Sequence, residues 1–194
     1  MAPGGNWSSA RRVLYEAPMS EGLDLPRVDR GASLPEADRL ARFDAALPQV
    51  LSALDGEGDA VALQSTLACL LWEVFAQASW CGFYRRVAES TLAVGPYQGP
   101  MGCLRIDFAR GVCGAAARTG QTQLVPDVEA FPGHIACDGA TRSELVVPVR
   151  DGNGRVRAVL DLDSHLPSAF SAAEAARLEA LLDEVFARRV GVAW

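Results

Sequence analysis

The chain has 194 residues, of which 49% are hydrophobic and 22% are charged, and its formal net charge is −6. This composition excludes wholesale disorder, and the length suits one compact domain with an appendage. No apolar run approaches the ~20 residues of a membrane-spanning helix, and an acidic chain has no general attraction for nucleic-acid phosphates. We therefore expect a soluble domain that binds neither membranes nor nucleic acids.

The sequence contains five cysteines but no Cys-x-x-Cys pair, which argues against a zinc ribbon. Residues 1–24 lack the apolar stretch of a secretory signal, so we expect a cytoplasmic protein in a reducing compartment. Each thiol is then either a small core residue or a reactive group. The five are Cys69, Cys81, Cys103, Cys113 and Cys137.

Residues 1–33 are rich in Gly, Pro and Ser and show no periodic pattern. We predict that they form a flexible or loosely docked extension before a single domain that spans residues 34–194. Ser33 and Glu36 have the spacing of a capping box at the start of a helix. Apolar residues at helical spacing extend this helix for about five turns, with a kink expected at Pro48.

A second, mostly buried helix is predicted over residues 59–78, where packing is the expected role of Cys69. From residue 79 the apolar residues come in short runs separated by Gly and Pro, which is typical of strands. The first four predicted strands span residues 80–87, 91–97, 103–108 and 122–125.

Residues 112–118 are predicted to form a short helix that ends at Gly120. The turn Asp151-Gly152-Asn153-Gly154 then predicts a hairpin. Ser171 and Glu174 have the spacing of a second capping box, at the start of the last helix. The two strands of the hairpin are predicted over residues 145–149 and 155–162.

This order of elements predicts an α+β fold. We expect a central antiparallel sheet of about six strands, with helices packed on one face and a pocket on the other. Side chains alternate between the two faces of a strand, so Glu144, Asp161 and Asp163 are expected on the face away from the helices. A merely solvated acidic face is the alternative.

The loop over residues 131–140 favours a functional interpretation of that face. It is long and irregular, and it contains Cys137. Long structureless loops in compact domains are usually functional or disordered, and the Phe, Ile and Cys in this loop argue against disorder. If the loop folds over the outer face of the sheet, Cys137 comes close to the three carboxylates. An inert thiol is the alternative for Cys137 alone.

Several short motifs, taken together, resemble the free methionine-(R)-sulfoxide reductases, which are built on the GAF fold. The resemblance covers about residues 35–190. The motifs are Trp80-x-Gly82-Phe83-Tyr84, Gly95-Pro96-Tyr97-Gln98-Gly99, Cys103-x-Arg105-Ile106, Gly111-Val112-Cys113-Gly114, Asp127-Val128, Gly133-His134-Ile135-Ala136-Cys137-Asp138, Ser143-Glu144-Leu145-Val146-x-Pro148 and Val159-Leu160-Asp161-Leu162-Asp163-Ser164.

The resemblance implies roles for three cysteines. Cys137 matches the catalytic cysteine, which attacks the sulfoxide sulfur and is left as a sulfenic acid. Cys103 matches the resolving cysteine that forms a disulfide with it, and Cys113 matches a third, auxiliary or alternative resolver. Thioredoxin is the expected external reductant, and no bound cofactor or metal is implied. Cys69 and Cys81 match no family cysteine.

The resemblance also implies how the pocket holds free methionine sulfoxide. Glu144 and Asp163 are expected to contact the sulfoxide, with Asp161 in support, because a carboxylic acid of raised pKa can protonate the leaving oxygen. Trp80 and Tyr84 share one strand face and are placed to wall the S-methyl group. Ordinary sheet packing is the alternative for the two aromatic residues.

Two other classes of function compete with the enzyme. One is a GAF module that binds a ligand without turnover, and the other is a thiol redox sensor in which Cys103 and Cys137 switch a dimer. A sensor has no need of the full set of cysteines and carboxylates, so the enzyme is the preferred interpretation. The resemblance is compatible with a homodimer, because GAF domains often pair through their terminal helices.

Overall fold

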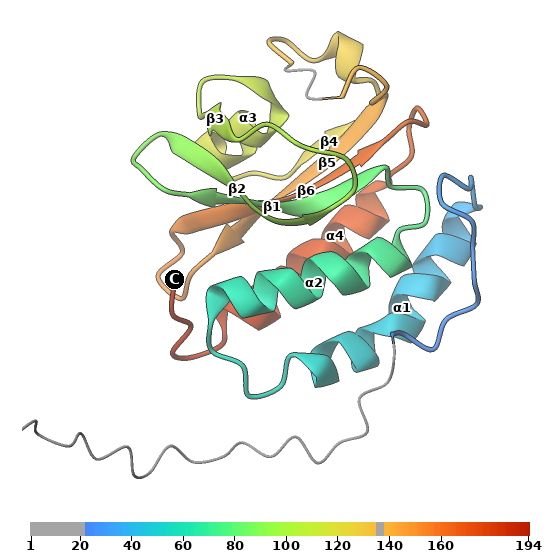
Figure 1. Cartoon of the computed structure of the whole chain (residues 1–194), viewed down its shortest axis with the longest axis horizontal. Helices are drawn as coiled ribbons and strands as arrows, with labels where there is room; N and C mark the ends of the chain where they lie inside the picture. The colour runs from blue at the N-terminus through green and yellow to red at the C-terminus, as the bar shows by residue number, and fades with distance from the viewer. Residues whose placement is uncertain (1–21, 135–137) are drawn as a thin grey trace, which may run out of the picture.

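A six-stranded antiparallel sheet with strand order β3-β2-β1-β6-β5-β4 divides the domain into two sides (Figure 1). The computed structural model describes residues 22–134 and 138–194. No helix in these two ranges is both long and apolar enough to span a membrane. The elements are α1 (Glu36–Ala53), α2 (Ala60–Val74), β1 (Trp80–Arg86), β2 (Thr91–Gln98), β3 (Arg105–Asp107), α3 (Gly111–Thr119), β4 (Gln123–Val125), β5 (Ser143–Arg150), β6 (Val156–Ser164) and α4 (Ala172–Leu182).

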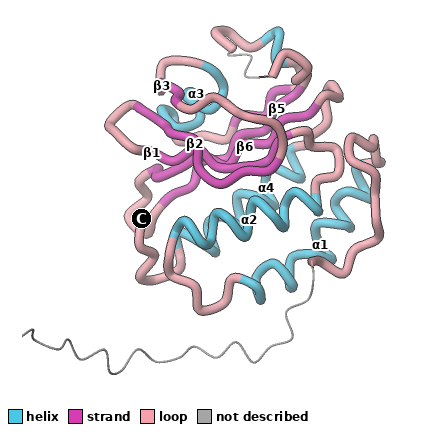
Figure 2. Tube along the Cα trace, in the orientation of Figure 1, coloured by secondary structure: helices cyan, strands magenta, loops and turns pink. Residues whose placement is uncertain are grey.

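The predicted α+β architecture is confirmed, with one addition. Helices α2 and α4 pack against one face of the sheet and α1 packs against α2 (Figure 2). The fourth helix, α3, contacts β3, β5 and β6 from the other face. Helix α3 therefore covers part of the pocket side of the sheet, a position that the sequence pattern did not predict.

Strand alternation sorts the apolar side chains into two separate cores. Leu145 and Val147 of β5, with Leu160 and Leu162 of β6, are fully buried against α1, α2 and α4. Val146 and Val159 are equally buried, but on the α3 side. Burial of each such side chain contributes roughly 1.5–3 kcal/mol, so the pairing of β5 with β6 is held firmly in one register.

One of the two predicted capping boxes is present. At the start of α4, the Ser171 hydroxyl accepts from the Glu174 amide while the Glu174 carboxylate accepts from the Ser171 amide. At α1 the prediction is wrong, because the cap residue is Pro35 and no side chain caps the helix. Ser33 lies two residues before that cap, too early to close the first turn.

The two cysteines without a family match have different environments. Cys81 is fully buried in the helix-side core, as a packing role requires. Cys69 is exposed, so the packing prediction for it is wrong. It follows Val61 and Ser65 at intervals of four residues, and all three lie on the exposed side of α2.

Residues 22–33, which the composition assigns to the extension, lie against the helices. Leu23 and Leu25 pack on the helix-side core. The Arg30 guanidinium donates to the carbonyls of Trp72 and Phe75, and it lies 3.7 Å from the centre of the Trp72 ring. This part of the expected extension is therefore docked to the domain, while residues 1–21 lie outside the described residues.

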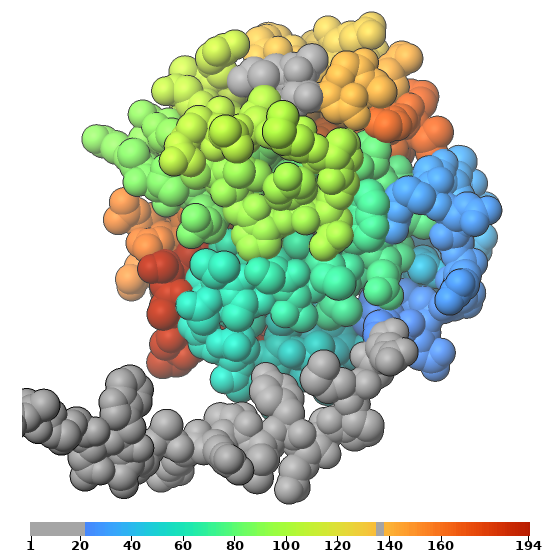
Figure 3. All heavy atoms as spheres, in the orientation of Figure 1, coloured from blue at the N-terminus to red at the C-terminus, as the bar shows by residue number. Residues whose placement is uncertain are grey.

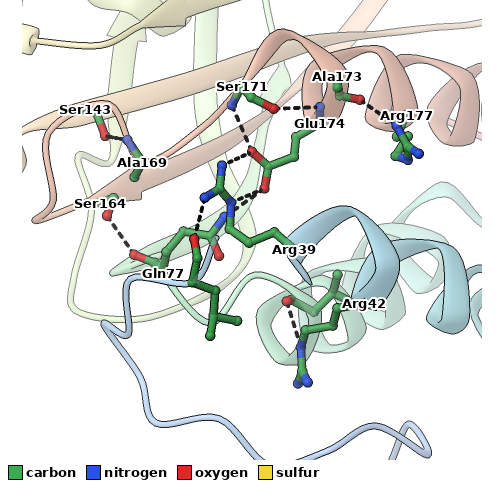
Figure 4. A network of polar contacts seen from close by, with 12 residues as sticks. Arg39, Arg42, Gln77, Ser143, Ser164, Ala169, Ser171, Ala173, Glu174 and Arg177 are labelled. Atoms are coloured by element: carbon green, nitrogen blue, oxygen red, sulfur yellow. Dashed lines mark hydrogen bonds and ion pairs between the residues drawn. The ribbon is translucent and has the colours of Figure 1, made fainter. Parts of the chain in front are cut away.

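A buried ion pair ties the helices together (Figure 4). Glu174 at the start of α4 is fully buried. Its two carboxylate oxygens accept from the Arg39 guanidinium of α1 at 2.8 and 3.0 Å. The Gln77 amide, from the link between α2 and β1, donates to the same carboxylate at 3.0 Å. Three segments that are distant in sequence thus converge on one carboxylate.

We predict that Glu174→Ala lowers the free energy of unfolding by about 3 kcal/mol, because it leaves a half-buried guanidinium and a buried amide without their acceptor. Urea denaturation followed by circular dichroism measures this change. Glu184→Ala is the control. It removes only a surface pair with Arg188 and should cost less than ~1 kcal/mol. Equal losses in the two variants would contradict the role given to Glu174.

Candidate active site

A narrow cavity of about 40 Å³ lies on the α3 side of the sheet. Both aromatic residues and acids line it. The lining residues are Trp80, Tyr84, Pro100, Met101, Gly102, Ile106, Gly111, Val112, Cys113, His134, Asp138, Thr141, Glu144, Asp161 and Asp163.

The register of the central strands brings the three predicted acids together. Glu144 of β5 lies directly opposite Asp163 of β6, which lies opposite Trp80 of β1. Asp161, two residues earlier on β6, faces the same side and lies opposite Gly82 of β1. The acids lie on the face away from α1, α2 and α4, as the alternation predicts. The solvated-face alternative is excluded, because Glu144 and Asp161 are only 6% and 5% exposed.

Helix α3 brings Cys113 into the acid cluster. The Cys113 Sγ lies 3.9 Å from Glu144 Oε1. One ligand atom from each of Cys113, Glu144 and Asp161 lies within 4.8 Å of the other two. Asp161 Oδ1 is buried and has no hydrogen-bond partner among the residues that the structure describes.

A glycine lets α3 approach so closely. A Cβ at Gly114 would lie 2.5 Å from the Asp107 carbonyl oxygen at the end of β3, which is closer than atoms can approach without a shift of the backbone. Any larger residue at position 114 would push α3 outward. The distance between Cys113 and Glu144 therefore depends on this glycine.

Burial dominates the acid–base properties of the cluster. Burial, followed by the charges of Asp161 and Asp163, raises the pKa of Glu144 well above its ordinary value. Burial also raises the pKa of Asp163 and raises that of Asp161 to about 7. The pKa of the Cys113 thiol is raised in the same way, mainly by burial and then by the neighbouring acids. The cluster therefore retains protons at neutral pH.

Trp80 and Tyr84 of β1 line the cavity beside the acids, and Tyr97 of β2 supports Trp80 from outside the lining. Trp80 stacks on Tyr84 with ring centres 5.5 Å apart, and on Tyr97 with centres 5.2 Å apart. The Trp80 indole donates to the Pro100 carbonyl at 3.0 Å, which fixes the ring. Tyr97 was not predicted. The sequence feature that could have indicated Tyr97 is Gly82 on the neighbouring strand β1, because a Cβ at position 82 would lie 2.2 Å from the Tyr97 Cβ.

The other predicted cysteines lie at or beyond the edge of this site. Cys103 is half-buried against the pocket-side core, and it is disulfide-bonded. Its backbone forms a hydrogen bond with the Tyr84 hydroxyl, which lines the cavity. Cys137 lies outside the described residues, and so does its expected approach to the carboxylates.

Three lining residues from the loop before β5 were not predicted as site residues. They are His134, Asp138 and Thr141. His134 Nε2 lies 3.9 Å from Glu144 Oε2, and burial lowers the pKa of the imidazole. Asp138 Oδ2 lies 2.9 Å from His165 Nε2 and accepts a hydrogen bond when that nitrogen carries the proton. The length and composition of the loop indicated that it has a functional role, but they could not show which of its side chains face the cavity.

The described lining contains several acids but no arginine, and the chain has no lysine at all. His134 is the one basic side chain among these lining residues, and burial favours its neutral form. The acid cluster therefore has no fixed cation beside it. A bound group that carries positive charge would complete the site electrostatically.

We predict that Asp161→Asn stabilises the protein, and more so at pH 8 than at pH 5. Between the ordinary pKa of 3.8 and the folded value of about 7, the unfolded chain releases this proton and the folded chain keeps it. Stability therefore falls as pH rises through that window. The gain should grow by about 2 kcal/mol from pH 5 to pH 8, measured by urea denaturation at both values.

Asp44→Asn is the matched control with the opposite sign. A hydrogen bond from Arg177 lowers the pKa of Asp44, so this acid adds stability above its ordinary pKa. The variant should lose stability at pH 8. A gain for Asp161→Asn that is the same at both pH values would contradict the raised pKa.

Comparison with known proteins agrees with this geometry. Residues 38–194 match the GAF domain family. The free methionine-R-sulfoxide reductase of Escherichia coli is 41% identical over 116 residues, which are 60% of this chain and 69% of that protein. The enzyme of the same name from Saccharomyces cerevisiae is 45% identical over 115 residues, 56% of this chain and 64% of that protein.

Solved structures give the same result. A free methionine-R-sulfoxide reductase from Neisseria meningitidis, crystallised with its substrate, superposes with a TM-score of 0.75 at 38% sequence identity. The match covers 86% of this chain and 93% of that one. The chain therefore belongs to the GAF-domain family and, within it, to the free methionine-R-sulfoxide reductases.

Proposed function

We propose that this protein reduces free L-methionine-(R)-sulfoxide to L-methionine. The observation that carries the proposal is the group of three proton-retaining acids that lines a small cavity together with the stacked rings of Trp80 and Tyr84, with no arginine or lysine among the described lining residues. The activity named for the relatives in E. coli and S. cerevisiae supports it. We propose that the protein acts in the cytoplasm and that the reaction uses no bound cofactor or metal.

The cavity suits the reacting end of a small amino acid. Its lining combines aromatic and acidic side chains. Trp80 and Tyr84 offer an apolar surface to the methyl group. The carboxylates provide a counter-charge for the substrate ammonium. A methionine within a protein chain has no free ammonium to offer, so the free amino acid is the preferred substrate.

The proposed first half-reaction transfers the oxygen to a cysteine. The Cys137 thiolate attacks the sulfoxide sulfur while a carboxylic acid, Glu144 or Asp163, protonates the oxygen. The S–O bond breaks, methionine leaves, and Cys137 carries the oxygen as a sulfenic acid. Asp161 supports the two proton donors. Raised pKa values of the acids are what this step requires at neutral pH.

The second half-reaction regenerates the thiols. The Cys103 thiol condenses with the sulfenic acid of Cys137, which releases water and forms a disulfide. A dithiol protein such as thioredoxin then reduces this disulfide by exchange and supplies the two electrons. The disulfide-bonded state of Cys103 supports its role as resolver. The free, buried thiol of Cys113 is the auxiliary resolver.

The competing functions explain less of the site. Ligand pockets for drug-sized molecules are usually ~300–1,000 Å³, so the cavity does not suit the larger ligands of sensory GAF modules, such as cyclic nucleotides, haem and bilins. A thiol switch requires cysteines but no buried acid cluster. Pairing of two chains through their terminal helices, α1 and α4, remains compatible with the enzyme.

Assay with the separate epimers tests the proposal. Purified protein with a thioredoxin system should consume free L-methionine-(R)-sulfoxide and spare the S epimer. Cys137→Ser should abolish turnover, whereas Cys69→Ser, at an exposed position remote from the cavity, should retain it. Activity that survives in Cys137→Ser would overturn the mechanism, and the absence of turnover of either epimer would favour a sensor.

A second prediction concerns the proton donor. Glu144→Gln keeps the shape of the side chain but cannot deliver a carboxylic proton, so kcat/KM for the R epimer should fall by about 10² or more. Glu179→Gln is the control, because Glu179 is exposed and bonds only to Thr122 outside the cavity. A loss smaller than tenfold in Glu144→Gln would assign proton donation to another acid.

A further inference from the structure

We propose that Cys113, Glu144 and Asp161 form a binding site for a single thiophilic divalent cation of the Zn²⁺ class. Tetrahedral zinc with one sulfur and two oxygen ligands needs donor atoms ~3.4–3.6 Å apart. The Cys113 Sγ lies 3.9 Å from Glu144 Oε1, and all three donor atoms lie within 4.8 Å of one another. Small rotations of these side chains would complete the geometry.

An independent observation points to a missing ligand at this place. Asp161 is only 5% exposed, yet its Oδ1 has no hydrogen-bond partner among the described residues. A buried carboxylate oxygen without a donor costs free energy. The Cys113 thiol and the protonated carboxyl group of Glu144 can donate to the Asp161 carboxylate, but no arginine lines the described part of the cavity, so no side-chain cation there offsets its charge. A metal ion bonded to that oxygen would.

The donor set selects the kind of ion. One thiolate and two carboxylates suit Zn²⁺, which accepts sulfur and oxygen ligands alike. Mg²⁺ and Ca²⁺ prefer oxygen ligands alone, so the sulfur of Cys113 disfavours them. Three protein ligands leave the fourth position to water, for which the adjoining cavity has room. The charge of the ion would stabilise the ionised forms of all three groups.

Such an ion would act as an inhibitor and not as a cofactor. It would occupy the carboxylates that the proposed function assigns to the substrate, so metal and sulfoxide would exclude each other. This consequence rests on the proposed function. The metal site itself rests only on the positions of Cys113, Glu144 and Asp161.

Cobalt provides a direct test, because Co²⁺ reports a thiolate ligand by an ultraviolet charge-transfer band and four-coordinate geometry by intense visible bands. The full chain, kept free of reductant so that Cys103 stays disulfide-bonded, is titrated with Co²⁺. We expect saturation at one equivalent with both sets of bands, and their loss when Zn²⁺ is added.

Two variants assign the ligands. Cys113→Ser should abolish the ultraviolet band, while Cys69→Ser, which removes the exposed free thiol, should retain it. Asp161→Asn should weaken Co²⁺ binding at least tenfold without loss of the fold. The proposal is overturned if the band survives in Cys113→Ser, if Asp161→Asn binds as tightly as the parent, or if no band appears.

The same titration separates this proposal from the proposed function. In the presence of L-methionine-(R)-sulfoxide, the apparent affinity for Co²⁺ should fall as the sulfoxide concentration rises. Cobalt bands that do not respond to sulfoxide would leave the metal site in place and contradict the proposed competition. Sulfoxide turnover in a protein that shows no cobalt bands would contradict the metal site and leave the proposed function in place.

Discussion

The pairing of β5 with β6 is the constraint on which the site depends. It sets Glu144 opposite Asp163 and Val146 opposite Asp161. Because side chains alternate strictly, a slip of one residue would turn the acids of one strand into the helix-side core and expose its leucines. The hydrophobic burial that fixes this register also holds the carboxylates on the pocket side. Stability of the core and placement of the acids are therefore two results of one pairing.

This arrangement is electrostatically unfavourable in isolation. Three acids and a thiol lie together at the cavity, and no arginine or lysine lies among the described residues that line it. The folded chain tolerates them by keeping them protonated, and the large, mainly apolar core on the other face provides the stability that offsets the cost. A cluster of this kind retains protons and attracts cations. Both properties are useful for a sulfoxide that carries an ammonium and must be protonated to react.

Much of the fold could be predicted from sequence, because its main signals are local. Alternation in residues 156–164 placed Asp161 on the correct face, and Ser171 and Glu174 marked the start of α4. The predictions that failed needed information from elsewhere in the fold. Ser33 has the spacing of a cap, but Pro35 begins α1. Cys69 lies in a largely apolar helix, yet only the packing of α2 on the sheet shows that its side faces outward.

The residues of the candidate site divide in the same way, into those that local patterns predict and those that depend on contacts between elements. Glu144, Asp161 and Asp163 followed from strand period and resemblance, but their closeness to the Cys113 thiol depends on how tightly α3 packs at Gly114. Tyr97 and His134 were not predicted as site residues, because their positions depend on the pairing of β1 with β2 and on the path of the loop after Phe131. Local patterns indicate which face a side chain takes, while contacts between elements decide what it meets there.

The separation of the two cores by a single sheet has a consequence for how the sequence can vary. Along β6, neighbouring residues serve different purposes: Leu160 and Leu162 belong to the helix-side core, while Val159 and Asp161 face the pocket. Substitutions at the even-numbered positions of this strand should therefore change the stability of the helix-side core, and with it the amount of folded protein. Substitutions at the odd-numbered positions should change the chemistry of the pocket. Drift in α1, α2 and α4 can proceed without touching the residues that line the pocket, so one scaffold can keep its stability while the other face acquires a new ligand.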